Sequence, residues 1–379
     1  MLKKLKKETA DNAEKLAWLR LTRTENVGPV SFYRLVEAYG SAAKALEKIP
    51  QLATRGGRSK PLIIPAADVI EREYEGLRKL GGDIVTAADP QYPLALSALE
   101  DAPPVLSYLG DPGLLNKSCI AMVGARNASL NGKKFAEKLA RDLGAAGQVV
   151  VSGLARGIDT AAHVGALDTG TIAVVAGGID VIYPPENQKL YDEIKERGLV
   201  VAESPLAQQP FAQSFPRRNR IVSGLSAGVV VVEATMRSGS LITARLAGEQ
   251  GRDVFAVPGH PLDPRAEGPN HLIREGAQLV RSAEDILEHL LNFNRTRGFS
   301  DSAANDFTAP PLHTEDDPQM FDEAREAVLS VLSTTPVAID DLIREGGLSV
   351  ALAQTVLLEL ELAGRVQRLP GNRVVLLTT

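Results

Sequence analysis

Residues 215–243 read FPRRNRIVSGLSAGVVVVEATMRSGSLIT, and the fold and the candidate site can both be approached from this stretch. It begins with a helical pattern that carries three arginines. The continuous apolar run at residues 228–234 is typical of a strand that is buried on both faces of a parallel sheet. The Ser-Gly-Ser turn at residues 238–240 then opens a helix, where free backbone N–H groups favour an anion. Arginines beside such a helix start predict a site for a polyanion.

Apolar runs alternate with helical patterns from about Gly82 to Leu291, which predicts a mostly parallel sheet covered by helices on both faces. The predicted strands are CIAMVGA, QVVVSG, TIAVVAG, LVVAE, GVVVVEA and RDVFAVPG. Doubly wound sheets bind their ligands at the carboxyl ends of the strands, so the six loops that follow should converge on one face. We therefore expect a Rossmann-like, doubly wound α/β domain with its ligand site on that face.

Two smaller domains are expected on either side of the sheet. The pattern VGPVSFYRLVEAYGS from Val27 resembles a helix-hairpin-helix, whose glycine turn can present N–H groups to a DNA phosphate, although a helical packing module is the alternative. Three helical patterns and a β-hairpin near the C-terminus predict a winged helix. The expected boundaries are a helix-hairpin-helix or SAM-like domain at 1–78, the Rossmann-like domain at 79–291, a flexible linker at 292–320 and the winged helix at 321–379.

The helix that would read DNA in the winged helix carries few cations. It offers Gln354, Thr355, Glu359 and Glu361, and no basic residue occurs before Arg365. Because duplex binding depends on neutralising phosphates, a protein-contact or vestigial role is favoured for this domain.

Composition is that of an ordinary globular protein, with 379 residues, 44% hydrophobic and 23% charged. Cys119 stands alone, which excludes a disulfide framework and suits a reducing cytosol. The N-terminus lacks the apolar region of a signal peptide and no run approaches a membrane span, so we expect a cytoplasmic protein without membrane contact. The formal charge of −5 arises at the C-terminal end, because residues 300–379 contain thirteen acidic and five basic residues.

The loops after the first three strands add glycines and cations. VGARNASLNGKK places Arg126 directly after a strand, SGLARGIDTAAH places Arg156 in a turn of small residues, and Lys189 follows the third loop. Neither GxGxxG nor GxxxxGK[ST] occurs, so neither a dinucleotide fingerprint nor a P-loop is present and no cofactor is expected. Asp159 and His163 have a spacing that fits a metal or an acid/base pair, but a helix-dipole partner and a packing histidine are the simpler interpretations.

Two interpretations stay open for the residues of the opening stretch. Phe215 either stacks on a nucleic-acid base or anchors its own helix, and the anchor is slightly favoured. The three arginines either form salt bridges, with Glu203 or Glu233 as partners, or bind the ligand. Three arginines so close together should leave at least one free for a ligand.

These motifs resemble the DprA/Smf family, DNA-processing protein A, in order and spacing. They are VGAR from Val123, SGLARGIDTAAHVGAL from Ser152, GGIDVIYPPEN from Gly177, FPRRNRIVSGLS from Phe215, VVEATMRSGSLITA from Val231 and VPG from Val257. The resemblance covers about residues 80–290, and Ala125 replaces a serine often found at that position. It implies a cytoplasmic recombination mediator of natural transformation that binds and protects incoming single-stranded DNA, forms a homodimer through its Rossmann-like domain and helps to load the RecA recombinase, without being an enzyme.

The loops and the resemblance together give one set of candidate DNA-binding residues, with no catalytic residue and no metal ligand among them. The set is Gly124, Arg126, Ser152, Gly153, Arg156, Gly157, Lys189, Phe215, Arg217, Arg218, Asn219, Arg220, Ser238, Gly239 and Ser240.

Two other functions compete with this one. A related sheet serves phosphoribohydrolases that act on nucleoside monophosphates, whose PGGxGTxxE turn binds phosphate and supplies a catalytic Glu; here the turn reads EATMRSGSLITA and no acid follows until Glu249. Loss of free-base release on Glu233→Gln would favour such an enzyme. A transcription regulator acting through the winged helix is the third hypothesis, and the acidity of that domain disfavours it.

Overall fold

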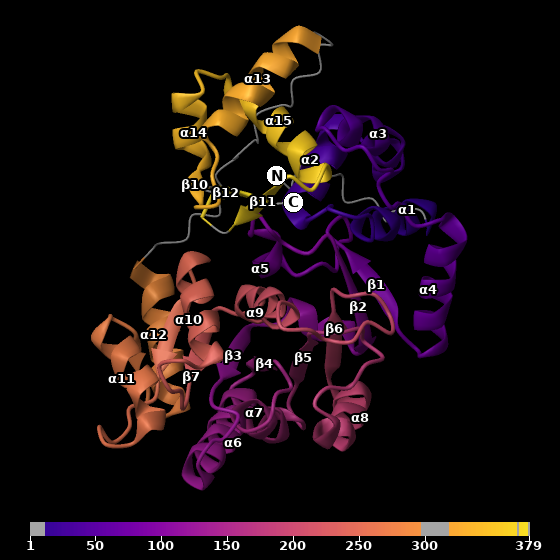
Figure 1. Cartoon of the computed structure of the whole chain (residues 1–379). Coiled ribbons are helices and arrows are strands. Elements are labelled where there is room, and N and C mark those ends of the chain that lie inside the picture. The colour runs from indigo at the N-terminus through magenta and orange to yellow at the C-terminus, as the bar shows by residue number, and fades with distance from the viewer. Residues whose placement is uncertain (1–11, 297–317, 370, 378–379) are drawn as a thin grey trace. The chain divides into compact units, whose positions relative to one another are not determined.

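The computed structural model describes residues 12–296, 318–369 and 371–377, and these form two compact units (Figure 1). One unit combines the described residues up to Arg72 with those from Pro318 onward. The other contains the described residues from Glu73 to Thr296. Within the described ranges, no helix has both the length and the apolar character needed to cross a bilayer.

A nine-stranded sheet forms the centre of the larger unit, in the order β1-β2-β6-β5-β4-β3-β7-β8-β9. The strands are β1 (Asp83–Thr86), β2 (Val105–Gly110), β3 (Cys119–Val123), β4 (Val149–Ser152), β5 (Thr171–Val175), β6 (Leu199–Ala202), β7 (Gly228–Val231), β8 (Asp253–Ala256) and β9 (Gln278–Leu279). Strands β3 to β8 are the six that the sequence predicts, and the pairs from β6 through to β9 are parallel. Strands β1, β2 and β9 were not predicted; β1 and β2 add antiparallel pairs at one edge.

Helices cover both faces of this sheet, as predicted. They are α5 (Leu94–Ser97), α6 (Leu130–Ala145), α7 (Ile158–Ala166), α8 (Gln188–Arg197), α9 (Ser214–Gly224), α10 (Gly239–Glu249), α11 (Glu267–Arg274) and α12 (Ala283–Thr296). Alternate side chains of β3 point to opposite faces. Ile120 and Met122 pack in one core with residues of α6, α7 and α12, whereas Ala121 and Val123 pack in another with residues of α9 and α10.

The order of the strands fixes where a ligand should bind. From β3 the chain adds β4, β5 and β6 on one side, and then returns to add β7, β8 and β9 on the other. This reversal between β3 and β7 is a topological switch point, where the loops at the carboxyl ends of the strands diverge and leave a crevice. The helical and Ser-Gly-Ser parts of the opening stretch, α9 and the start of α10, both adjoin this region.

The smaller unit contains the predicted helical hairpin and the predicted winged helix. The N-terminal helices are α1 (Asn12–Thr22), α2 (Pro29–Tyr39), α3 (Ala42–Arg55) and α4 (Ala67–Lys79), the last of which continues into the larger unit. The winged helix consists of α13 (Pro318–Val331), β10 (Val337–Ala338), α14 (Ile339–Glu345), α15 (Val350–Leu362), β11 (Val366–Leu369) and β12 (Arg373–Leu376). Gly40 ends α2 with a left-handed φ of 81°.

The linker predicted for residues 292–320 lies mostly outside the described residues. The described helices on either side of it, α12 and α13, extend to Thr296 and begin at Pro318.

Candidate nucleic-acid interface

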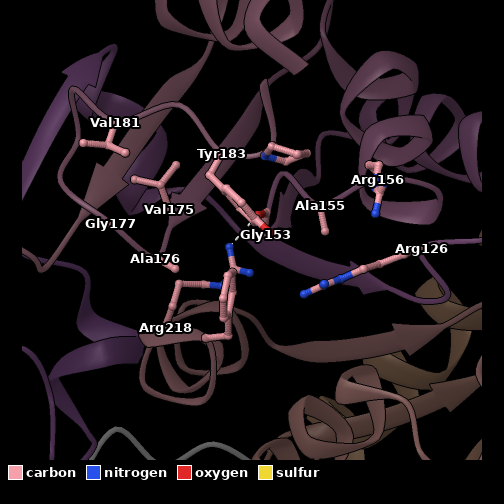
Figure 2. A pocket seen from close by; sticks show the side chains of 12 residues that line it. Arg126, Gly153, Ala155, Arg156, Val175, Ala176, Gly177, Val181, Tyr183 and Arg218 are labelled. Atoms are coloured by element: carbon pink, nitrogen blue, oxygen red, sulfur yellow. Dashed lines mark hydrogen bonds between the residues drawn. The ribbon is translucent and has the colours of Figure 1, made fainter. Parts of the chain in front are cut away.

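A pocket lies where the loops after β3, β4 and β5 meet the first turns of α9 (Figure 2). It is lined by Arg126, Gly153, Ala155, Arg156, Val175, Ala176, Gly177, Val181, Tyr183, Pro184, Phe215 and Arg218. The structure thus brings five of the candidate residues together: Arg126, Gly153, Arg156, Phe215 and Arg218. Three arginines and two aromatic rings around one depression form a surface that suits a nucleic acid.

The guanidinium of Arg218 occupies the middle of this pocket, with Arg126 reaching towards it from the other side (Figure 2). Only 8% of Arg218 is exposed. Its Nη1 donates to the carbonyl oxygens of Gly153, at 2.5 Å, and of Val174. A Cβ atom on Gly153 would lie 2.6 Å from the guanidinium, so the glycine is needed to make room for the arginine.

A buried carboxylate accompanies this guanidinium. Asp159, at the start of α7, accepts hydrogen bonds from the backbone N–H groups of Gly153, at 3.1 Å, and Ala155, at 3.4 Å. Burial raises the pKa of the Asp159 carboxyl, which the charge of Arg218 opposes. Burial also lowers the pKa of Arg218 to about 10, although the charge of Asp159 raises it. Because this pKa is still well above 7, the guanidinium stays charged at neutral pH. The pair fixes the loop after β4 to α9.

Other small residues of the set serve packing between loops. Gly157 has a φ of 83°, and a Cβ there would lie 2.2 Å from the carbonyl oxygen of Ala125. The hydroxyl of Ser152 is buried and donates to the carbonyl oxygen of Met122 at 2.6 Å. A Cβ on Gly124 would lie 2.6 Å from Ile158. The small residues of these loops therefore serve the packing of the loops on one another.

Exposed cations surround the pocket. Arg126 and Arg217 are exposed, and neither has an ion-pair partner among the described residues. Arg156 is also exposed and lies 3.6 Å from the exposed carboxylate of Glu186, a contact that solvent weakens. These three guanidinium groups are available to a ligand in a way that the buried Arg218 is not.

Two aromatic rings complete the pocket. Phe215 and Tyr183 have ring centroids 5.7 Å apart with planes inclined by 53°, and the guanidinium carbon of Arg126 lies 5.5 Å from the centre of the Phe215 ring. Phe215 is half-buried, whereas 46% of Tyr183 is exposed. Tyr183 is absent from the candidate set, although its place before two prolines in a loop at the carboxyl edge was a usable signal.

The remaining residues of the arginine cluster have structural partners. Arg220 is buried; its Nη2 bonds to Glu203 Oε1 at 2.5 Å and its Nη1 donates to the carbonyl oxygen of Asp101 at 2.6 Å. The salt bridge to Glu203 is one of the two that the sequence suggested. Asn219 accepts a hydrogen bond from Arg218 Nε at 3.3 Å. Arg217 is therefore the arginine of the cluster that points to solvent.

Ten of the fifteen candidates are not part of the pocket lining, and the four not yet described lie on α8 and at the start of α10. The side chain of Lys189, on α8, is 91% exposed, and its Nζ lies 3.7 Å from Oε1 of Glu193, one turn further along the helix. Ser238 caps α10: its Oγ accepts from the N–H of Ser240 at 3.4 Å, and the two hydroxyls lie 2.6 Å apart. Gly239 between them is exposed. Because β7 and β4 flank β3 on opposite sides, this turn and the pocket belong to different sides of the switch point.

Glu233, the residue on which the enzyme alternative depends, is engaged elsewhere. Its two carboxylate oxygens accept hydrogen bonds from Ser129, one from the N–H at 2.8 Å and one from the hydroxyl at 2.6 Å. Ser129 is the N-cap of α6, so the carboxylate sits at a helix N-terminus, where its charge is stabilised. Among the described residues, no three His, Cys, Asp or Glu side chains group as metal ligands.

His163 is fully buried and gives a testable pH dependence. Its Nδ1 lies 2.7 Å from the Thr171 hydroxyl, which itself donates to Val150. Burial, and secondarily the charge of Arg218, lower the pKa of His163 from 6.5 to about 3. Between pH 6.5 and pH 3, His163 binds a proton in the unfolded chain but not in the folded protein. The free energy of unfolding is therefore highest above pH 6.5 and decreases as the pH falls towards 3. We expect wild type to lose stability faster than His163→Asn between pH 7 and 4 in urea unfolding; parallel pH profiles would contradict this.

The fold and the pocket define a class, that of a Rossmann-like α/β protein with arginines and aromatic rings around a pocket at the carboxyl edge of its sheet. The family model described as DNA recombination-mediator protein A matches residues 83–291. The models described as a DprA-like N-terminal HHH domain and a DprA winged helix domain match residues 12–76 and 308–372. The chain belongs to the DprA/Smf family. The family's description names a mediator of recombination, in agreement with the expectation that the chain is not an enzyme.

Named relatives and solved structures agree with this assignment. Protein Smf of Synechocystis sp. is 31% identical over 96% of this chain and 98% of its own, and protein Smf of Escherichia coli is 40% identical over 80% of each. The structure of DNA processing protein A from Streptococcus pneumoniae has a TM-score of 0.61 and 36% identity, covering 73% of this chain and 98% of that one. A Helicobacter pylori homologue, described as having a unique single-stranded DNA binding mode, has a TM-score of 0.52 and 33% identity over 56% of this chain and 96% of that one.

Proposed function

We propose that this protein is a recombination mediator that binds single-stranded DNA along the carboxyl edge of its parallel sheet. One observation carries the proposal: Arg126 and Arg217 are exposed and have no ion-pair partner in the described part of the chain, Arg126 lines the pocket beside the Phe215 and Tyr183 rings, and Arg217 lies on the same helix as Phe215. The cations would neutralise phosphates, while the rings would stack on unpaired bases.

The aromatic pair favours a single strand over a duplex. The faces of bases in a duplex are covered by their neighbours, so only an unstacked base can lie on the Phe215 or Tyr183 ring. Stacking reads no hydrogen-bonding edge, and little sequence preference follows. Lys189 and the Ser238–Ser240 turn lie beyond the pocket and would extend the track past one nucleotide.

Within the candidate set, we propose two roles. Arg126, Arg156, Phe215 and Arg217 would contact DNA directly, with Lys189, Ser238, Gly239 and Ser240 as more distant contacts. The others, Gly124, Ser152, Gly153, Gly157, Arg218, Asn219 and Arg220, would act by positioning the loops, because their side chains or their lack of one serve contacts within the protein.

The cellular part of the proposal rests on membership of the family. We propose that the protein acts in the cytoplasm during natural transformation, where it protects incoming single strands and helps to load the RecA recombinase. In this proposal it acts as a homodimer formed through the Rossmann-like domain. Strand exchange by RecA on DNA coated with a single-strand-binding protein, with and without this protein, measures the loading step.

Base stacking is tested by Phe215→Leu, which keeps an apolar side chain and removes the ring. We expect affinity for single-stranded DNA to fall by about 1–3 kcal/mol, or about 5- to 150-fold. The loss should be much smaller on an abasic strand of the same length, because that strand has no base to stack. Phe211→Leu is the matched control, since Phe211 is 45% exposed and lies outside the pocket lining. Equal losses on normal and abasic strands would show that Phe215 only anchors α9.

A further inference from the structure

The helix α15 of the winged helix is covered by the N-terminal helices of the same compact unit (Figure 1). Its polar residues Gln354, Thr355 and Glu359, which a DNA-reading winged helix would expose, are 6%, 5% and 0% exposed. The face of the winged helix that would enter a DNA groove is therefore already occupied by protein.

Polar contacts run along the whole of this covered face. Arg34 of α2 donates to the side-chain carbonyl of Gln354, and the hydroxyl of Ser31 donates to the carboxylate of Glu361. At the C-terminal end of α15, Asn26 Nδ2 donates to the carbonyl oxygen of Leu362 at 3.1 Å. The backbones also approach closely, because a Cβ on Gly56 would lie 2.0 Å from the carbonyl oxygen of Glu359.

The two domains that meet in this contact carry opposite net charge, although Glu361 is also paired with Arg368 of the winged helix at 3.2 Å. Residues 12–66 contain nine Lys and Arg against four Asp and Glu, whereas residues 318–377 contain eight Asp and Glu against five Lys and Arg. The carboxylate of Glu361 lies at the first turn of α2, where a helix attracts negative charge. Arg55 interacts electrostatically with Glu359. The acidic end of α15 thus meets the hairpin where an anionic ligand would be favoured.

The winged helix itself is incompletely satisfied behind this contact. Glu359 is paired with Arg325 of α13, 3.3 Å away, yet within the described residues Glu359 Oε1 and Arg325 Nε have no hydrogen-bond partner. Buried charges that are only partly compensated reduce the net stability of the packing around them while they still specify its geometry. The helix that covers the hairpin is therefore held by packing of reduced stability, which favours its displacement by a competing polyanion.

We propose that α15 is an internal acidic ligand of the N-terminal helical hairpin, and that the hairpin face around Ser31 and Arg34 binds the sugar-phosphate backbone of duplex DNA when the winged helix is displaced. The aromatic residues Trp18, Phe32 and Tyr33 of the hairpin pack on one another, so we expect this face to offer cations and no ring on which a base could stack. This fits the backbone of a duplex and differs from the pocket on the sheet.

Two variants release the contact in different ways. Gly56→Ala places a methyl group against the Glu359 carbonyl; its φ of −66° suits alanine, so the clash exists only in the docked state. Glu361→Gln removes the carboxylate and keeps the shape. Both are made in the Arg126→Ala/Arg217→Ala background, so that binding by the sheet contributes much less to the signal. Gly248→Ala is the matched control, because no atom lies within 4 Å of a Cβ there.

The readout is the affinity for a labelled duplex at several salt concentrations. We expect each variant to bind at least tenfold more tightly than its background, with a log-log salt slope steeper by about 2 to 3, from roughly 0.9 for each of two or three phosphates. If both variants and the Gly248→Ala control bind the duplex like the background, the proposal is wrong. Binding of single-stranded DNA by the protein with Arg126 and Arg217 intact tests the pocket on the sheet separately. If that binding is absent, the result with the duplex still stands.

Discussion

Replacing Arg126 and Arg217 together with alanine is expected to lower the affinity for single-stranded DNA by about two to four orders of magnitude. Each charge-assisted contact is worth about 1.5–3 kcal/mol, and tenfold in affinity corresponds to about 1.4 kcal/mol. The stability should change little, because both side chains are exposed and have no ion-pair partner among the described residues.

Salt dependence shows whether the lost contacts are phosphate contacts. Removing two of them should make the log-log slope shallower by about 1.4, from roughly 0.7 for each phosphate on a single strand. Arg72→Ala/Arg141→Ala is the control, since both arginines are exposed, lie outside the pocket lining and change the net charge equally. If the two double variants lose affinity to the same extent, the change in net charge explains the loss, and specific contacts of Arg126 and Arg217 with DNA do not.

Arg218→Ala is expected to destabilise the protein by about 3–5 kcal/mol, although Arg218 is next in sequence to Arg217. The substitution removes the hydrogen bonds from the buried guanidinium to the carbonyl oxygens of Gly153 and Val174, and it leaves the buried Asp159 without the nearby positive charge; together these losses cost about this much. Urea unfolding followed by circular dichroism measures the loss. Arg217→Ala is the adjacent control, with an expected change within about 0.5 kcal/mol.

A second substitution separates structure from binding at this position. In a variant that already carries Arg218→Met, the additional substitution Asp159→Asn removes the uncompensated negative charge. The free energy of unfolding of this double variant should be higher than that of Arg218→Met alone. If Arg218→Ala is as stable as Arg217→Ala and loses only DNA affinity, then Arg218 is a ligand of DNA and our assignment is wrong. For the same reason, an Arg217→Ala/Arg218→Ala double variant would mix a binding effect with an unfolding effect.

The sequence was sufficient for the strands of the parallel sheet and for the location of the site. Runs such as CIAMVGA are apolar at nearly every position, which is the pattern of strands buried on both faces, and the loops after them have a fixed edge in a doubly wound sheet. The strands at residues 83–86, 105–110 and 278–279 escaped prediction; all three lie towards the edges of the sheet, and the last has only two residues.

Which of the three clustered arginines is buried and which faces solvent could not be predicted from the sequence alone. Successive residues of a helix point about 100° apart, so Arg217, Arg218 and Arg220 face different surroundings. Which of them faces solvent depends on how α9 lies on the sheet, and the partner Asp159 is distant in sequence. The covering of α15 did leave a signal, since LSVALAQTVLLELELAG is apolar around most of the helix. Its partner could not be predicted, because hydropathy does not identify what covers a face.

The contact between Ser31 and Glu361 joins residues that are 330 positions apart in the chain. Ribosomes add about 5–20 residues per second, so the hairpin is made roughly 15–65 s before the helix that covers it. During that interval the nascent chain presents its basic hairpin to the surrounding nucleic acid, including the ribosome that makes it. If the messenger RNA ends before the codons of α15, the product lacks the helix that covers this face. Such fragments should be retained on polyanionic matrices at salt concentrations that elute the whole protein.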